Sequence, residues 1–322
     1  MKLKTKSLNV VGKSQGRHRR KRKILRKDNL QLLTMNLPGI ILLTLFSYLP
    51  MFGLIVAFKK YKASTGFFGS PWVGLENFKF FLTSGVLGRL LKNTVGLNLV
   101  FLLCNTIITI VLALLLYEVK NRIAVKMIQT IIFLPFIVSW VAASYALYAN
   151  ISDVNGIING ILQAFGKEKI AWYTTPQYWP VILLICHLWK NIGYGTIIYY
   201  GNLISIDKSY FEAAQLDGAT RIQMMRHIAL PFIRPIVTMF FILSLGRVFS
   251  ADFGMFFYMT KNSSLLYSTT DVIDTYVYRA LRVTGDVGMS TAVGLCQSVV
   301  GFIVLVAVNK IATKYSEEGA VF

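Results

Sequence analysis

The chain has 322 residues, of which 55% are hydrophobic and only 15% are charged. Soluble domains carry about 25% charged residues, so this composition excludes a protein with water on all sides. Apolar runs of about 20 residues, the length that a helix needs to cross the hydrocarbon core, recur along the whole chain. The pattern therefore also excludes a secreted soluble protein and predicts an integral membrane protein.

The net charge of +20 is concentrated near the start of the chain. Twelve of the 34 Lys and Arg residues lie between Lys2 and Lys27, ahead of the first apolar run. Basic residues of this kind stay on the cytoplasmic side and attract anionic headgroups of the lipid bilayer. We predict a basic cytoplasmic tail over residues 1–30 and no nucleic-acid partner. A signal peptide is excluded because no small-residue cleavage site follows the first apolar run.

Six apolar runs predict the membrane domain. The expected transmembrane helices cover residues 31–58, 92–117, 127–149, 178–203, 232–258 and 290–312. The expected fold class is therefore an all-α membrane protein, with a six-helix domain at 31–312 and a short cytoplasmic tail at 313–322. Basic connecting segments place both termini in the cytoplasm.

No residue pattern indicates a catalytic centre or a metal site. The cysteines all lie in apolar runs, and the histidines are scattered: Cys104, Cys186, Cys296, His18, His187 and His227. Metal ligands and redox cysteines come at characteristic spacings that are missing here. The sequence also shows no nucleophile-base pair or paired carboxylates, as a membrane transferase would need. We expect no metal, no bound cofactor and no catalytic residue.

The segment between the fourth and fifth predicted helices carries the strongest local signals. Ser209 with Glu212 and Thr220 with Gln223 have the spacing of capping boxes, which start helices. Gly218 lies between them and permits the backbone conformation of a sharp turn. These signals predict two short cytoplasmic helices joined at an angle.

The identities within this segment form a recognisable motif. Glu212-Ala213-Ala214 is followed after three residues by Gly218, then after nine by Ile228, with Leu230-Pro231 closing the segment. This spacing resembles the EAA loop of bacterial ABC importer permeases. The stretches Tyr48–Gly53, Gly69–Leu75 and Gly193–Thr196 are similar to the oligosaccharide and polysaccharide branch of carbohydrate-uptake permeases.

This resemblance implies a type I importer permease fold in the bacterial plasma membrane. It implies pairing with a second homologous permease and with two copies of a cytoplasmic ABC ATPase, while an extracytoplasmic solute-binding protein delivers the solute. ATP and Mg would bind to the partner ATPase, because this chain lacks the G-x-x-x-x-G-K-[ST] phosphate loop.

The resemblance also assigns roles within the motif. A coupling segment at 207–231 would contact the ATPase, its helix Phe211 to Asp217 would lie in a groove of that partner, and Pro231 would separate it from the next transmembrane helix. ATP-driven closure would then rock the transmembrane helices in alternating access. The implied coupling residues are Glu212, Ala213, Ala214, Asp217, Gly218, Ile228, Leu230 and Pro231.

Polar residues at membrane depth are costly and mark solute pathways by default. On this ground we predict pathway residues in the fourth and fifth helices: Trp189, Lys190, Asn191, Tyr194, Arg247 and Asp252. The alternative is that these groups are polar contacts between helices. Two cations, Lys190 and Arg247, would suit an acidic glycan.

Other transport functions stay open at this point. An ABC importer for a non-sugar solute carries a similar coupling loop. A secondary transporter or channel is less favoured, because no inverted repeat is visible and the Glu212 to Pro231 segment has the importer pattern.

Overall fold

The computed structural model describes residues 27–83 and 85–315 of the chain. The described residues are helical or irregular, apart from one isolated bridge between Lys59 and Trp72. Most of the predicted basic tail at 1–30 and of the tail at 313–322 lies outside the described residues. The chain divides into two compact units, 1–53 and 54–322, which are described separately below.

The first unit is a single helical segment. Helix α1 (Lys27–Leu43) continues through a π-helical turn, Thr44–Tyr48, into a 3-10 helix, Leu49–Phe58, whose last residues belong to the second unit. The apolar part, Gln31–Phe58, is long enough to cross a membrane and matches the predicted helix at 31–58. Pro38 lies inside α1 without ending it.

The second unit contains all other elements. Its long helices are α4 (Leu87–Glu118), α5 (Arg122–Ile137), α8 (Trp179–Leu203), α11 (Leu230–Leu245) and α14 (Val287–Tyr315). The shorter helices are α2 (Gly66–Gly69), α3 (Glu76–Thr83), α6 (Trp140–Ile151), α7 (Ile157–Ala164), α9 (Lys208–Leu216), α10 (Arg221–Met224), α12 (Tyr267–Thr270) and α13 (Ile273–Arg279). Single 3-10 or π turns occupy Trp172–Thr174, Pro176–Tyr178, Met225–Ala229, Met255–Met259, Ser264–Leu266 and Ala280–Thr284.

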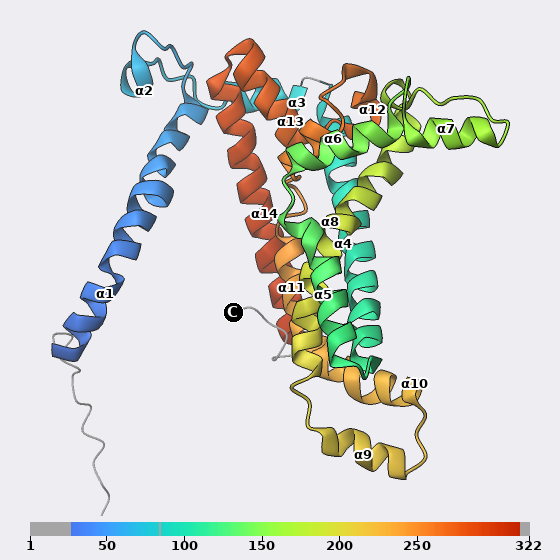
Figure 1. Ribbon diagram of the computed structural model, residues 1–322. Helices are drawn as coiled ribbons and strands as arrows, with labels where there is room; N and C mark the ends of the chain where they lie inside the picture. Colours follow the sequence, from blue (N-terminus) through green and yellow to red (C-terminus); the bar gives the residue numbers. More distant parts are fainter. Residues whose placement is uncertain (1–26, 84, 316–322) are drawn as a thin grey trace, which may run out of the picture. The chain divides into compact units, whose positions relative to one another are not determined.

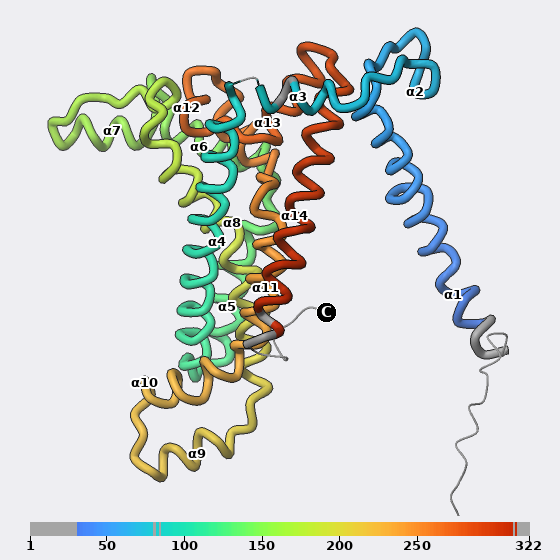
Figure 2. The backbone as a smooth tube through the Cα atoms, turned by 180° about the vertical axis from the view of Figure 1, so that it is seen from behind, coloured from blue at the N-terminus to red at the C-terminus, as the bar shows by residue number. Residues whose placement is uncertain are grey.

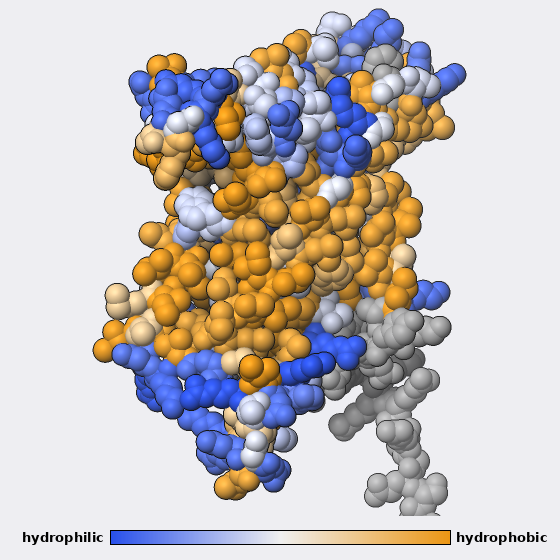
Figure 3. Space-filling view, turned by 90° about the vertical axis from the view of Figure 1, so that its right-hand side faces the viewer, coloured by the Kyte–Doolittle hydropathy of each residue, from blue (hydrophilic) through white to orange (hydrophobic). Residues whose placement is uncertain are grey.

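The long helices form a bundle with a distinct set of short helices at each end. In Figures 1 and 2, α9 and α10 lie at one end, while α6, α7, α12 and α13 lie at the other. Figure 3 shows a broad apolar band across one face of the molecule, with polar surface toward both ends. Exposed apolar side chains in water would be unfavourable, so the band is the surface that lipid covers.

The predicted all-α membrane fold is confirmed. Five helical segments are long and apolar enough to cross a membrane, and a bent pair makes a sixth: Gln31–Phe58, Leu87–Glu118, Pro176–Leu203, Arg221–Leu245, Val287–Ile311, and the pair Arg122–Ile137 with Trp140–Ile151. For four of these segments, the predicted boundaries lie within a few residues of the observed ones.

The third predicted helix, 127–149, corresponds to two helices that are separated by a sharp break. Helices α5 and α6 meet at an angle of 99°. Pro135 in the last turn of α5 has no N–H to continue the hydrogen-bond ladder, and Val138 is extended. The side chain of Ser139 then accepts a hydrogen bond of 3.2 Å from the Ala142 N–H and starts α6 as its N-cap.

The fifth predicted helix, 232–258, is displaced toward the start of the chain. A continuous helical segment runs from Arg221 to Leu245, and turns follow before the π-helical turn at Met255–Met259. Pro231 therefore does not separate the coupling segment from the membrane helix. It lies in the first turn of α11, directly after a π-helical turn whose wider winding accommodates its missing N–H.

Helix α8 packs against both α4 and α5, and two glycines allow it to approach them closely. A Cβ atom at Gly193 would collide with the carbonyl oxygen of Ile132 and lie 2.9 Å from Cα of Phe133 in α5. A Cβ at Gly195 would lie 2.7 Å from Cγ2 of Thr109 in α4. Small residues at such positions are how membrane helices pack backbone to backbone.

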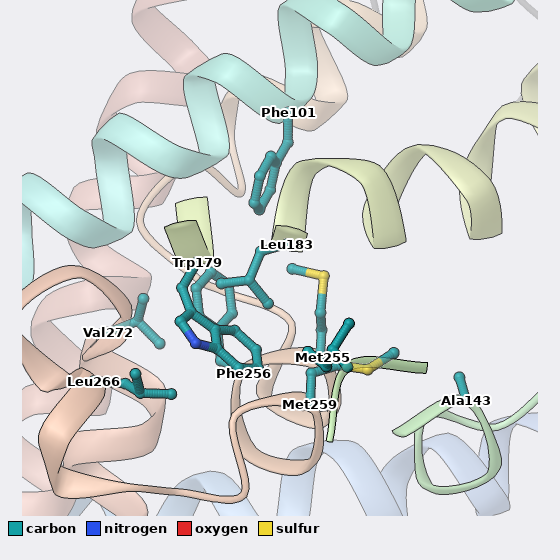
Figure 4. Packing of buried hydrophobic residues seen from close by; sticks show 10 residues of the cluster. Phe101, Ala143, Trp179, Leu183, Met255, Phe256, Met259, Leu266 and Val272 are labelled. Carbon is teal, nitrogen blue, oxygen red and sulfur yellow. The ribbon is translucent and has the colours of Figure 1, made fainter. Parts of the chain in front are cut away.

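A buried apolar cluster fixes the end of the bundle opposite α9. Figure 4 shows Trp179 and Leu183 of α8 against Phe256 and Met259, with Phe101 of α4 above them. Trp179 is completely buried, and its indole N–H donates a hydrogen bond of 2.8 Å to the Trp172 carbonyl. The cluster anchors the elements that bound the cavity described below.

Opposite charges at the same end are partly paired. The buried carboxylate of Asp271 forms ion pairs with Arg279 and, at 3.3 Å, with Arg89. Asp274 instead accepts a hydrogen bond of 2.7 Å from the backbone N–H of Ala251. Burial raises the pKa of the Asp274 carboxyl group.

Candidate functional site

A cavity of 720 Å³ lies between α4, α8, α11 and the turns that follow α11. Its walls combine aromatic, amide and charged side chains. The lining residues are Asn98, Phe101, Leu102, Asn105, Thr106, Thr109, His187, Asn191, Tyr194, Gly195, Ile198, Tyr199, Phe240, Phe241, Ser244, Arg247, Val248, Ser250, Ala251, Asp252 and Met255.

The α4 wall of the cavity has unsatisfied polar groups. Oδ1 of Asn105 and Oγ1 of Thr109 are buried and have no hydrogen-bond partner among the described residues. Asn98, seven residues before Asn105, donates hydrogen bonds to the carbonyls of Val248 (2.9 Å) and Ser250 (3.1 Å). Because buried polar groups are normally paired, Asn105 and Thr109 are available to bind water or a polar solute.

The α8 wall contains two of the predicted pathway residues. Asn191 donates a hydrogen bond of 2.9 Å to the carbonyl of His187, whose ring stacks on Phe101 at 4.8 Å. The ring of Tyr194 stacks on Phe136 with centroids 4.9 Å apart. Asn191 and Tyr194 both line the cavity.

Arg247 and Asp252 also line the cavity, but they do not pair with each other. Within the part of the chain that the structure describes, Arg247 is exposed and forms no ion pair. Asp252 accepts a hydrogen bond of 2.6 Å from the indole N–H of Trp140, at the start of α6. The cavity therefore presents a free guanidinium group and a carboxylate that is tied to the broken third helix.

Lys190 and Trp189 are not among the lining residues. The Lys190 ammonium donates to the carbonyls of Phe136 (3.0 Å) and Val138, at the break between α5 and α6. It also lies 5.2 Å from the centroid of the Trp140 ring. These carbonyls are among those that a helix end leaves without partners, so Lys190 caps the end of α5. Trp189 is about half exposed.

Sequence reasoning missed the α4 wall and His187. Asn98, Asn105 and Thr109 are separated by seven and four residues, the helical spacing that puts side chains on one face. Together with the cost of amides at membrane depth, that spacing was a usable signal. His187 carried no comparable signal, because it stands alone in an apolar run and matches no metal-ligand spacing.

A second candidate site is the hairpin of α9 and α10. Asp207, and not Ser209, is the N-cap of α9, so the predicted Ser209–Glu212 capping box is wrong. The carboxylate of Asp207 accepts a hydrogen bond of 2.9 Å from the Ser209 N–H. This bond lowers the pKa of Asp207. Helix α9 runs from Lys208 to Leu216, slightly earlier than the predicted 211–217.

The turn between α9 and α10 matches the prediction. Gly218 has a φ of +80°, a conformation that glycine adopts without cost. Its N–H donates to the Gln215 carbonyl (3.1 Å), and the Ala219 N–H donates to Ala214 (2.9 Å), which together make a Schellman motif. Thr220 and Gln223 then form the predicted capping box at the start of α10.

The hairpin is attached to the bundle on one side and exposed on the other. Phe211 packs on Tyr117 of α4 with ring centroids 5.5 Å apart, and Ile228 packs in the same apolar cluster. Leu216 is 89% exposed and Ile222 77% exposed. The remaining motif residues, Glu212, Ala213, Ala214, Asp217, Leu230 and Pro231, are exposed or partly exposed. The outer face has the apolar centre and charged rim of a protein-binding surface.

Comparison with protein families gives one match over most of the chain. Residues 97–317 match the model of the family described as binding-protein-dependent transport system inner membrane component. The matched region contains both the cavity and the α9–α10 hairpin.

Individual relatives and a solved structure are similar over nearly the full length. The chain is 37% identical to the protein LplB of Bacillus subtilis, with 88% of each chain covered. It is 34% identical to the polygalacturonan/rhamnogalacturonan transport system permease protein YteP of the same organism, over 96% of this chain and 95% of that one. A crystal structure of a bacterial ABC transporter involved in the import of the acidic polysaccharide alginate superposes with a TM-score of 0.81 and 31% identity, over 89% of this chain and 96% of that one.

Proposed function

The chain belongs to the family of binding-protein-dependent transport system inner membrane components, and we propose that it forms half of the pathway by which an acidic oligosaccharide or polysaccharide fragment crosses the membrane. It is a multi-pass permease subunit of an ABC importer, as the sequence predicted. The proposal adds the solute class, the position of the pathway and the site of coupling.

The cavity between α4, α8 and α11 supports the position of the pathway. It combines unpaired amide and hydroxyl oxygens, at Asn105 and Thr109, with the aromatic rings of Tyr194 and Phe101. Sugars have a polar rim of hydroxyl groups and an apolar face, so a wall of this composition suits both.

The unpaired Arg247 carries the proposal of an acidic solute. A guanidinium group without an ion pair at membrane depth is costly unless a mobile anion or water compensates it. Its planar donors suit a carboxylate in two-point contact. Two of the similar proteins are named for acidic or pectic polymers, which agrees with this chemistry.

We propose that the outer face of the α9–α10 hairpin binds the partner ATPase, which holds ATP and Mg. The exposed Leu216 and Ile222 would enter an apolar groove, while Glu212 and Asp217 would meet polar groups at its rim. In this arrangement 207–231 is the coupling segment of the 31–312 membrane domain, and both chain termini are cytoplasmic.

The test is uptake by the reconstituted transporter. The chain is purified with its partner permease and ATPase, placed in proteoliposomes with the binding protein, and supplied with ATP. We expect uptake of an oligogalacturonate and much weaker uptake of the neutral reduced oligomer of the same length. The Arg247→Gln variant should lose this preference while still taking up solute.

Each outcome of this test has a distinct meaning. Equal uptake of both oligomers would contradict the acidic preference but not the importer. Uptake of neither, with a non-sugar solute transported, would contradict the glycan assignment. Uptake that persists without ATP would instead support a secondary transporter.

A further inference from the structure

Helix α7 has its apolar side turned outward. Ile157, Ile161 and Phe165 recur at intervals of four residues, which places them on one face of the helix. They are 59%, 51% and 79% exposed, respectively. In a water-exposed surface helix, the apolar stripe packs against the core, so α7 has the opposite arrangement.

A polar residue attaches α7 to the rest of the protein. Asn159 is 1% exposed and lies on the side of the helix opposite Ile157 and Ile161. Its amide donates to the Ile170 carbonyl (3.0 Å), while its Oδ1 accepts from the N–H of Ile170 and from the indole of Trp172, both at 3.1 Å. These bonds fix the rotation of α7 about its own axis, so the exposure of the apolar side is built into the fold.

The orientation of α7 shows where this apolar side points. In Figures 1 and 2, α7 lies across the direction of α4 and α8 and projects sideways from the bundle, at the end opposite α9. The segment 165–172, to which Asn159 is bonded, returns along the side of α7 that is farther from α9. The opposite, apolar side therefore faces toward the level of the transmembrane helices.

We propose that α7 is an interfacial helix whose apolar side, Ile157, Ile161 and Phe165, inserts into the outer leaflet of the lipid bilayer. A helix parallel to the membrane with one apolar side binds at the boundary between headgroups and acyl chains. The apolar segment Pro176–Leu203 begins soon after α7 in the chain, and Val181, near its start, is exposed. The polar residues Gln163 and Lys167 are exposed and are available to the headgroup layer.

The test compares two positions two residues apart on α7. In the assembled transporter, with Cys104, Cys186 and Cys296 replaced by alanine, a nitrobenzoxadiazole fluorophore is attached to Ile161→Cys or to the matched control Gln163→Cys. The complexes are placed in proteoliposomes. Quenching is then measured with a lipid carrying a nitroxide near its headgroup and, separately, with aqueous iodide.

We expect the probe at position 161 to be quenched several-fold more by the nitroxide lipid than the probe at 163, and to be shielded from iodide. The probe at 163 should respond to iodide. Shielding of position 161 from both quenchers would mean that a protein, such as the second permease or the binding protein, covers this side, and would overturn the proposal. Quenching of position 161 by iodide would also overturn it, because the side would then face water.

Discussion

The indole N–H of Trp140 donates a hydrogen bond of 2.6 Å to Oδ2 of Asp252, across 112 positions of the sequence. Trp140 begins α6 directly after the break in the third helix, and Asp252 lines the cavity. The same break is held from α8 by Lys190. The break and the cavity wall are therefore directly connected by hydrogen bonds.

Trp140→Phe tests this connection because it keeps an aromatic ring and removes the N–H. A hydrogen bond to a charged group contributes about 1.5–3 kcal/mol, so the Asp252 carboxylate should be held less firmly, by its remaining bond from the Met255 N–H (3.2 Å). We expect several-fold slower uptake by proteoliposomes with a normal yield of assembled transporter. Trp189→Phe, at a residue outside the cavity lining, is the control, and equal uptake by the two variants would speak against the connection.

Lys190 and Arg247 should respond differently to loss of their charge. Lys190→Met leaves the carbonyls of Phe136 and Val138 without their donor, so we expect a lower unfolding temperature of the detergent-solubilised complex. Arg247→Gln should leave that temperature unchanged and raise the concentration of acidic solute needed for half-maximal uptake. The opposite pattern would make Lys190 the solute contact.

The sequence predicted the membrane fold and the α9–α10 hairpin because both depend on local signals. Apolar length defines a transmembrane helix, and the turn at Gly218 and the capping box at Thr220 are set by neighbouring residues. The cavity depends on which faces of distant helices meet, and this is why Lys190 and Asn191, adjacent in sequence, have different environments. Pro135 made a kink in the third helix plausible, but its sharpness was not predictable, since proline inside a membrane helix is often tolerated.

Gly193→Ala should disrupt the contact between α8 and α5. The added methyl group would collide with the backbone of Ile132 and Phe133, which no side-chain rotation relieves. Overpacking of this kind costs about 1–3 kcal/mol. We expect a clearly lower unfolding temperature and yield. Gly201→Ala is the control, because it lies in the same helix and no atom is near the added methyl group. Its unfolding temperature and yield should match those of the parent protein. Equal losses in both variants would show that helix flexibility, and not packing, is responsible.

Gly218→Val should impair coupling because a β-branched residue is strained at a φ of +80°. We expect loss of the co-purified ATPase and of ATP-driven uptake. Asn tolerates this conformation, so Gly218→Asn should retain most of the co-purified ATPase and of the uptake.

Glu212→Lys keeps the backbone and reverses an exposed charge, and it should weaken the ATPase contact. Unchanged ATPase recovery and uptake in both Gly218→Val and Glu212→Lys would exclude the hairpin as the docking site.

Asp271→Asn should be far more destabilising than loss of the exposed ion pair between Arg221 and Glu118. Asp271 is 1% exposed and neutralises Arg279, which would become an unpaired, mostly buried charge. Breaking such a pair costs about 3–5 kcal/mol, whereas exposed pairs contribute about 0–1 kcal/mol. Thermal unfolding of Asp271→Asn beside Glu118→Gln measures the difference, and similar unfolding temperatures would contradict this ranking.

The continuous helical segment from Arg221 to Leu245 has a mechanical consequence. Helix α11 follows α10 and the π-helical turn without a gap, and its 16 residues span about 24 Å at helical rise, up to the cavity residues Phe241 and Ser244. A helix of that length tilted by about 7° moves its far end by about 3 Å, roughly the width of a water molecule. A small rotation at the end of α11 next to α10 therefore reaches the cavity as a displacement large enough to admit or exclude a layer of solvent.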